Sequence, residues 1–189
     1  MSLVSVLRLE NGNLAPLHVY ELSSRGPLVN WLRRNAGCVT CSEYLDGVPL
    51  GETVNSVHCQ DVQQLTYASA SFDLCTSTEV FEHVPDDLRG FAELHRVLRP
   101  GGRLVFSVPM SSAARTVERA VLNGGEIHHM LPPEYHGDRI RGQGRVLAYR
   151  NYGLDILDRV SSQGFRDVRF VQPTHQIGRW VQPIIVATA

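Results

Sequence analysis

The sequence predicts an α/β fold in which a doubly wound parallel sheet forms a single domain. Short apolar runs of strand length alternate with amphipathic helical stretches between residues 17 and 109. Such alternation is typical of parallel sheets, because right-handed crossovers place helices on both faces. The length of 189 residues suffices for one domain spanning residues 1–189 with a substantial core, but hardly for two.

The clearest part of this pattern is one βαβ unit over residues 71–109. Residues 72–76 form an apolar run without polar alternation, as expected of a strand covered on both faces. A helix is predicted to start near Pro85 and Asp86, and its apolar stripe recurs at spacings of three and four through Phe91 and Leu94. The residues RPGG at 99–102 should end this helix, and residues 104–108 supply the next strand.

Before this unit, the pattern gives a strand at residues 17–22, a helix from Pro27 to Gly37, and strands at 38–42 and 54–59. Residues 1–16 have weak periodicity, and we expect a short cap with scarcely room for a helix. After the unit, residues 113–121 predict a helix, and residues 126–145 read as a long loop of the kind that forms a functional lid or is disordered. Residues 111–150 are therefore expected to be a lid or insertion. A helix at 154–161 and strands at 168–170 and 184–187 complete the pattern.

Charge and composition narrow the function classes. The formal net charge is −1 and no basic run is present, so we expect no nucleic-acid partner. No apolar run approaches a membrane span and no signal peptide is apparent, so we expect a cytoplasmic protein. The four cysteines are interpreted as buried reduced thiols, because the lone CxxC of Cys38 and Cys41 has no second ligand pair at zinc-ribbon spacing.

Three acidic residues follow successive predicted strands: Glu21, Glu43 and Asp61. In open α/β sheets, ligands bind outside the carboxyl ends of the strands, where the strand order reverses. An acid after the second strand can accept hydrogen bonds from both hydroxyls of a ribose. These residues therefore predict a nucleoside site, whereas the alternative is a set of solvated loop carboxylates.

The segments SFDLCTSTEVFEHV and ELHRVLRPGGRLVFSVP resemble the fourth strand, its loop, the following helix and the fifth strand of class I S-adenosylmethionine-dependent methyltransferases. The resemblance is strongest to the type 11-like branch that acts on small molecules, and it extends more weakly over residues 17–109. It implies a Rossmann-like, mostly parallel sheet whose last strand is antiparallel, formed by residues 165–189. It also implies S-adenosyl-L-methionine as cofactor and a small-molecule or sugar-like methyl acceptor.

The same resemblance assigns roles to individual residues. Glu43 would bind the ribose with Tyr44 beside the adenine, Asp61 and Val62 would read the adenine edge, and Glu21 would lie near the methionine part. The remaining cofactor positions are those of the first turn and of the loop after the fourth strand: Leu22, Ser23, Gly26, Thr78, Glu79 and Val80.

The first turn departs from the family pattern. Where the family has roughly GxGxG, this chain has Ser23, Ser24, Arg25, Gly26 and Pro27. A dinucleotide pyrophosphate depends on close backbone approach at this turn more than a carboxylate and an ammonium do. The change therefore disfavours an NAD-dependent oxidoreductase, and it leaves open a degenerate, non-catalytic domain used for protein association, with its pocket filled by Arg25 or Tyr20.

Histidines supply the candidates for acceptor chemistry. By resemblance, His83 sits at the edge of the pocket, where it is either a catalytic base or a packing and capping residue. In the loop, His128, His129, Tyr135, His136 and Arg139 are expected to contact the acceptor, or else the loop is an ordered element without a ligand. No metal is expected, because the histidine spacing matches no helical two-histidine zinc motif.

Overall fold

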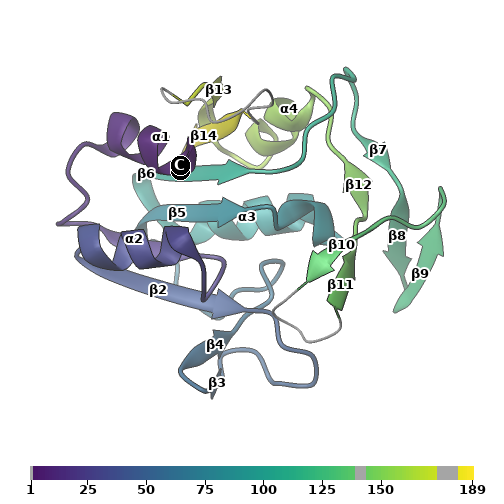
Figure 1. Cartoon of the computed structure of the whole chain (residues 1–189), viewed down its shortest axis with the longest axis horizontal. Coiled ribbons are helices and arrows are strands. Elements are labelled where there is room, and N and C mark those ends of the chain that lie inside the picture. Colours follow the sequence, from purple (N-terminus) through teal and green to yellow (C-terminus); the bar gives the residue numbers. More distant parts are fainter. Residues whose placement is uncertain (1, 139–143, 174–182) are drawn as a thin grey trace.

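The computed structural model describes residues 2–138, 144–173 and 183–189, and Figure 1 shows how its elements follow one another. The helices of the described residues are α1 (Ser2–Asn11), α2 (Pro27–Asn35), α3 (Asp87–Val97) and α4 (Ile156–Ser161), with a 3-10 turn, η1 (Phe81–His83). The main sheet contains β1 (His18–Glu21), β2 (Cys38–Glu43), β3 (Thr53–Val54), β4 (Val57–Cys59), β5 (Phe72–Thr78), β6 (Leu98–Ser107), β13 (Arg166–Val171) and β14 (Ile184–Thr188). Between β6 and α4 lies the β7–β12 segment, with β7 (Val117–Glu118), β8 (Ala120–Asn123), β9 (Glu126–His129), β10 (Tyr135–Asp138), β11 (Gly144–Leu147) and β12 (Arg150–Asn151).

The main sheet has the order β13-β14-β6-β5-β1-β2-β4-β3. Strands β6, β5, β1, β2 and β4 pair in parallel, whereas β14 pairs antiparallel with β6 and with β13. The chain winds outward in both directions from β1 and β5, so the strand order reverses between these two strands. The predicted fold class, a doubly wound sheet with an antiparallel last strand, is confirmed.

Helices cover both faces of the sheet, and successive strand residues alternate between two cores (Figure 1). Under α1 and α2, Val19 and Leu74 pack with Leu7 and Leu32. On the other face, the aromatic rings of β1 and β5 belong to the same core as α3 and α4, for example Phe72 with Phe91. Both faces are therefore apolar, which explains why these strands show no polar alternation.

Two predictions for the first half of the chain are wrong. The N-terminal residues form a helix of three turns, α1, whose Leu3, Val6 and Leu7 are buried against the sheet. These positions have helical spacing, but the stripe is short and was obscured by the polar residues around it. The predicted strand at 54–59 is a hairpin of β3 and β4, because Asn55 and Ser56 adopt positive φ angles of 49° and 65° and reverse the chain.

The β7–β12 segment also differs from its prediction. The expected helix at 113–121 is absent from the structure, where β8 and β9 form an antiparallel hairpin that turns at Gly124 and Gly125. The expected irregular loop contains β9, β10 and β11, and β10 pairs antiparallel with β11. Figure 1 shows these strands beyond the carboxyl ends of β5 and β6, so the segment borders the end of the sheet where a ligand is expected.

The unit from β5 to β6 is close to its prediction. Asp86 caps α3 by accepting a hydrogen bond from the backbone N–H of Arg89 at 3.0 Å, although the helix ends at Val97 and Leu98 already belongs to β6. All four cysteines are free thiols. Cys59 and Cys75 are buried as predicted, but Cys38 is exposed and Cys41 is only half-buried, which contradicts their predicted burial. Among the described residues, no helix has the length and apolarity that a membrane crossing requires.

Candidate functional site

A cleft of about 800 Å³ opens at the carboxyl end of the sheet, at the point where the strand order reverses. One wall comes from the strand ends and the other from the β7–β12 segment. Most of the predicted site residues line this cleft: Leu22, Ser23, Glu43, Tyr44, Asp61, Val62, Thr78, Glu79, Val80, His83, His129 and Tyr135. The other predicted residues, Glu21, Gly26, His128 and His136, are not part of its lining. Arg139 lies outside the described residues.

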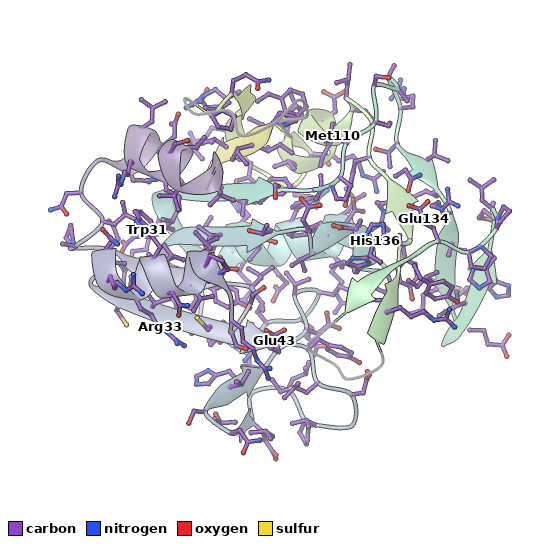
Figure 2. The ribbon with its side chains drawn as sticks, viewed as in Figure 1. Trp31, Arg33, Glu43, Met110, Glu134 and His136 are labelled. Carbon is purple, nitrogen blue, oxygen red and sulfur yellow. The ribbon has the colours of Figure 1, made fainter. Side chains whose placement is uncertain are left out.

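Glu43 ends β2 and is held by the turn that follows β1. The backbone N–H and the hydroxyl of Ser24 both donate to Glu43 Oε1, at 2.7 and 3.0 Å. Figure 2 shows Glu43 at the carboxyl end of β2, on the side of the molecule that carries the cleft. The first turn, which lacks the glycines of the family pattern, is thus hydrogen-bonded through Ser24 to Glu43, the carboxylate that this pattern assigns to the ribose.

Gly26 is the one glycine that the first turn retains. Its φ of 110° lies in the region that favours glycine, and it immediately precedes α2. A Cβ atom added at Gly26 would meet nothing within 4 Å. The conformation of the backbone, rather than crowding, therefore requires glycine here.

Asp61 lies just beyond β4 and is oriented by its own loop. The backbone N–H of Gln63 donates to Asp61 Oδ1 at 2.9 Å, and the side-chain amide of Gln63 donates to both carboxylate oxygens at 3.0 and 3.1 Å. Asp61 and Gln63 both line the cleft. The expected gathering of acids at neighbouring strand ends therefore holds for Glu43 and Asp61.

Glu21 has a different environment from these two acids. It ends β1 but is only 1% exposed, and the hydroxyl of Thr76 on β5 donates to its carboxylate. Burial raises the pKa of Glu21 from 4.5 to about 8, the Thr76 hydrogen bond opposes this, and the charge of Glu43 adds to it. Glu21 is therefore buried at the carboxyl end of β1, beside β5 and beneath the first turn, and is not exposed to the cleft.

Neither of the residues that could fill the pocket does so. Tyr20 contributes to the cleft wall, but its ring stacks on Phe72 with centroids 5.1 Å apart and its hydroxyl hydrogen-bonds to Ser42 at 2.7 Å. Arg25 is exposed and does not line the cleft.

The loop after β5 forms the wall that faces the β7–β12 segment. Glu79 has a positive φ of 52°, an uncommon conformation for a residue with a side chain, and it accepts a hydrogen bond from the Ser107 hydroxyl at 2.9 Å. Burial raises the pKa of Glu79, while the Ser107 hydrogen bond and the nearby His136 oppose this effect. This strained residue presents a carboxylate to the cleft.

His83 is held from the opposite side of the cleft. Its Nδ1 lies 2.8 Å from the carbonyl oxygen of Leu147, which can only accept, so Nδ1 carries a proton. In the neutral ring Nε2 is then unprotonated, and it lies 3.5 Å from Glu82 Oε1. The interaction joins η1 to β11, so His83 links the two walls.

Several residues of the site were not found by the sequence argument. Leu122 and Ile127 of the β8–β9 hairpin and Leu147 of β11 give the second wall an apolar character. Glu82, the neighbour of His83, is 1% exposed, and its backbone oxygen accepts from Tyr149 at 2.7 Å. The consecutive Gly124 and Gly125 were the signal for the hairpin, because two glycines in a row allow a tight turn.

Comparisons with known proteins agree with this geometry. Residues 25–106 match the family model of a methyltransferase domain, type 11. The chain is 43% identical over 102 residues to the ubiquinone biosynthesis O-methyltransferase of Coxiella burnetii, covering 53% of this chain and 43% of that protein. It is 28% identical over 130 residues to the malonyl-[acyl-carrier protein] O-methyltransferase of Hahella chejuensis, covering 63% of this chain and 47% of that protein. The chain thus matches less than half the length of these curated relatives.

Solved structures resemble the whole fold. An S-adenosylmethionine dependent methyltransferase from Mesorhizobium loti superposes with a TM-score of 0.63 at 19% identity, covering 100% of this chain and 98% of that one. The 1,6-didemethyltoxoflavin-N1-methyltransferase of Burkholderia thailandensis, solved with S-adenosylhomocysteine, superposes with a TM-score of 0.60 at 17% identity, covering 98% and 76%. Residues 25–106 thus match a methyltransferase domain of type 11, and the chain as a whole shares the fold of S-adenosylmethionine-dependent methyltransferases.

Proposed function

We propose that this chain binds S-adenosyl-L-methionine in the cleft and transfers its methyl group to a small-molecule acceptor. The observation that carries the proposal is the meeting of Glu43, Asp61 and the loop of Thr78–Val80 in one cleft at the point of strand reversal. The relatives with names of known activity act as O- or N-methyltransferases, according to those names. A small acceptor fits a cleft of about 800 Å³, which lies within the usual range of small-ligand sites.

The residues of the cleft fit an adenosine. We propose that Glu43 accepts hydrogen bonds from the ribose, sharing its carboxylate with Ser24, because a carboxylate offers about four acceptor positions. Tyr44, Asp61 and Val62 would surround the adenine with one aromatic ring, one acceptor and one apolar side chain.

The methionine part would lie near the first turn and the loop after β5. Leu22, Ser23 and Thr78–Val80 line this part of the cleft. Gly26 and Glu21 would act indirectly, Gly26 through the shape of the turn and Glu21 by supporting the turn from below. When bound, the cofactor supplies an electrophilic methyl group on a sulfonium.

Residues of the second wall would hold the acceptor. We propose that residues 111–150, which contain all but the last residue of the β7–β12 segment, are an insertion of the one catalytic domain that covers the cleft. His129 and Tyr135 of this insertion would lie beside the apolar Leu122 and Ile127. Alignment of the two reactants supplies most of what methyl transfer needs. A hydroxyl acceptor must also lose its proton, and His83 Nε2 is the group that we propose to handle it, for about 10²-fold in rate or more.

A second candidate function is a domain that keeps the fold for protein association without turnover. The Ser24 hydrogen bonds favour it, because they occupy acceptor positions of Glu43 that a ribose would use. Binding of S-adenosylhomocysteine without methyl transfer to any of a broad acceptor panel would support this function, and transfer would exclude it.

The test is calorimetric titration of the purified chain with S-adenosylhomocysteine. We expect saturable binding of one equivalent, and we expect Glu43→Ala to weaken it by at least tenfold, which is about 1.4 kcal/mol. Glu52→Ala is the matched control, because Glu52 is an exposed glutamate outside the cleft lining, and it should bind like the parent chain. Absence of heat and of thermal stabilisation with this ligand would remove the proposal.

A further inference from the structure

Three side chains gather at the junction of the loop after β5 and the β7–β12 segment. Glu82, His83 and His136 each place one potential ligand atom within 4.8 Å of the others. We call them the Glu82 cluster. Figure 2 shows His136 and Glu134 near one another on the β7–β12 segment. The cluster joins residues that are more than 50 positions apart in the chain, so it was invisible to an argument from spacing.

Glu82 is the unusual member of the cluster. The side chain is 1% exposed, and neither carboxylate oxygen has a hydrogen-bond partner within the part of the chain that the structure describes. Burial raises its pKa to about 8, and the charge of Glu79 adds to this, while Arg150 opposes it. A buried carboxylate without a partner is costly, so a side chain in this state points to a group that is still to be bound.

The two histidines are oriented as metal ligands usually are. His83 Nδ1 donates to the Leu147 carbonyl oxygen at 2.8 Å, and His136 Nε2 lies 3.3 Å from Glu134 Oε1, an acceptor. The second nitrogen of each ring, His83 Nε2 and His136 Nδ1, faces the same oxygen, Glu82 Oε1, at 3.5 and 3.6 Å. Ligand histidines commonly fix their tautomer in this way, by donating the other N–H to a carbonyl or carboxylate.

The contacts with the two histidines leave the Glu82 carboxylate without a hydrogen bond among the described residues. When the rings are neutral and Glu82 is ionised, both facing nitrogens present lone pairs to an oxygen that also presents lone pairs, and both distances are longer than a normal hydrogen bond. A single cation between the three groups would convert this repulsion into attraction. Two imidazole nitrogens and one carboxylate form a donor set that suits first-row divalent metals such as Mn²⁺, Fe²⁺, Co²⁺ and Zn²⁺.

We propose that Glu82, His83 and His136 bind one divalent transition-metal ion at the acceptor wall of the cleft. The scaffold around the cluster is already fixed. The guanidinium of Arg150 donates to the carbonyl oxygens of Phe81 and Val84, at 3.1 and 2.5 Å, so the turn that carries Glu82 and His83 is clamped on both sides. Little ordering of this turn is needed when the ion binds.

The binding of the ion is independent of the proposed function, but the role that we give the ion rests on that function. His83 and Glu79 line the cleft, so an ion at the cluster would be within reach of an acceptor oxygen. A bound cation lowers the pKa of a hydroxyl that coordinates it. The acceptor class is therefore an oxygen nucleophile, a hydroxyl or enol. With the ion bound, both nitrogens of His83 are occupied, so His83 acts as a ligand and the acceptor proton passes to solvent in the cleft.

Cobalt titration tests the site. The full chain is stripped with a chelator and titrated with Co²⁺, and visible absorption reports an inner-sphere complex. We expect one saturable equivalent that Zn²⁺ displaces. His136→Ala should weaken the affinity at least tenfold, because it removes one of the three ligands. Its side chain is partly exposed, so we expect the variant to fold. His128→Ala is the control, because His128 is an exposed histidine of the neighbouring strand outside the cluster, and it should titrate like the parent.

Glu82→Gln gives a second variant of nearly the same shape and should also lose at least tenfold in affinity. The proposal fails if no visible band develops, if His136→Ala binds as tightly as His128→Ala, or if a thiolate-to-cobalt charge-transfer band places the ion on Cys38 and Cys41 instead. Titration with S-adenosylhomocysteine separates the two proposals. Cobalt binding without binding of S-adenosylhomocysteine would support the metal site and contradict the proposed methyltransferase. Binding of S-adenosylhomocysteine without cobalt binding would support the methyltransferase and contradict the metal site.

Discussion

Replacing Glu21 by glutamine should make the protein less sensitive to alkaline pH. Glu21 is buried, and its pKa is raised from 4.5 to about 8, chiefly by burial. Between these values the folded chain keeps a proton that the unfolded chain releases, so the free energy of unfolding falls as pH rises from about 4.5 to about 8. Glutamine cannot ionise, and the variant lacks this loss.

The magnitude follows from the pKa displacement. At about 1.4 kcal/mol for each pKa unit, the raised pKa of Glu21 lowers the free energy of unfolding by on the order of 4 kcal/mol above pH 8. Near pH 5.5 the same effect is only about 1.4 kcal/mol. The advantage of Glu21→Gln over the parent should therefore grow by about 3 kcal/mol between about pH 5.5 and about pH 8.5. For a chain of this length that corresponds to a difference of about 10 °C in Tm. Any change in hydrogen bonding to Thr76 is independent of pH and cancels in the comparison.

The assay is urea denaturation of the cofactor-free parent and of Glu21→Gln, at both pH values. Glu82, whose pKa is also raised, is present in both proteins and drops out of the difference. Glu52→Gln, at an exposed glutamate, is the control and should differ little from the parent at either pH. A stability difference between Glu21→Gln and the parent that stays constant within about 0.5 kcal/mol across this range would refute the reasoning.

Two further substitutions test the packing around the β7–β12 segment. Asp87→Asn should lower the free energy of unfolding by about 3 kcal/mol in urea titration, because the buried carboxylate accepts from Tyr152 at 2.9 Å and from Arg159 at 2.6 and 2.9 Å. Gly153→Ala should lower it by about 2 kcal/mol, read as a decrease in Tm, because its Cβ would lie 2.4 and 2.6 Å from the backbone of Arg115.

Asp158→Asn, at an exposed aspartate of the same helix as Arg159, and Gly137→Ala, where a Cβ meets nothing within 4 Å, are the respective controls. If the Asp87 and Gly153 variants are as stable as these controls, the contacts described do not support the fold.

The parts of the fold that the sequence could predict are those with local signals. The helix α3 has an N-cap at Asp86 and buried residues at the spacing of Phe91 and Leu94, and all of these lie within one short stretch. The neighbouring strands β5 and β6 are buried on both faces, so their apolar runs are unambiguous. Strand order then follows from the handedness of the crossovers.

The β7–β12 segment shows where this reasoning stops. Val117 and Val121 are four positions apart, which is helical spacing, yet both lie in strands and are exposed. Gly124 and Gly125 were the signal that could have revealed the hairpin, since two consecutive glycines allow the positive φ angles of a tight turn. A helix and a hairpin can share a short pattern, and tertiary contacts decide between them.

The site, too, contains residues whose positions the sequence could predict and residues whose positions it could not. Glu43 and Asp61 could be placed near one another because parallel strands end at one edge of a sheet. The burial of Glu21 could not, because it depends on Thr76 of a neighbouring strand. Nor could the sequence show that Glu82 would meet His136, since this contact depends on how the β7–β12 segment folds back.

Arg150 has a consequence for engineering this protein. Its guanidinium reaches from the β7–β12 segment to three main-chain oxygens, those of Phe81, Val84 and Pro85. A chimera that exchanges residues 111–150 for the corresponding stretch of a relative must therefore bring an arginine at this place. Without this arginine, three backbone carbonyl oxygens of the loop that carries His83 would lose their hydrogen-bond donor. The chimera could then acquire the acceptor selectivity of the relative and still have a poorly ordered cleft.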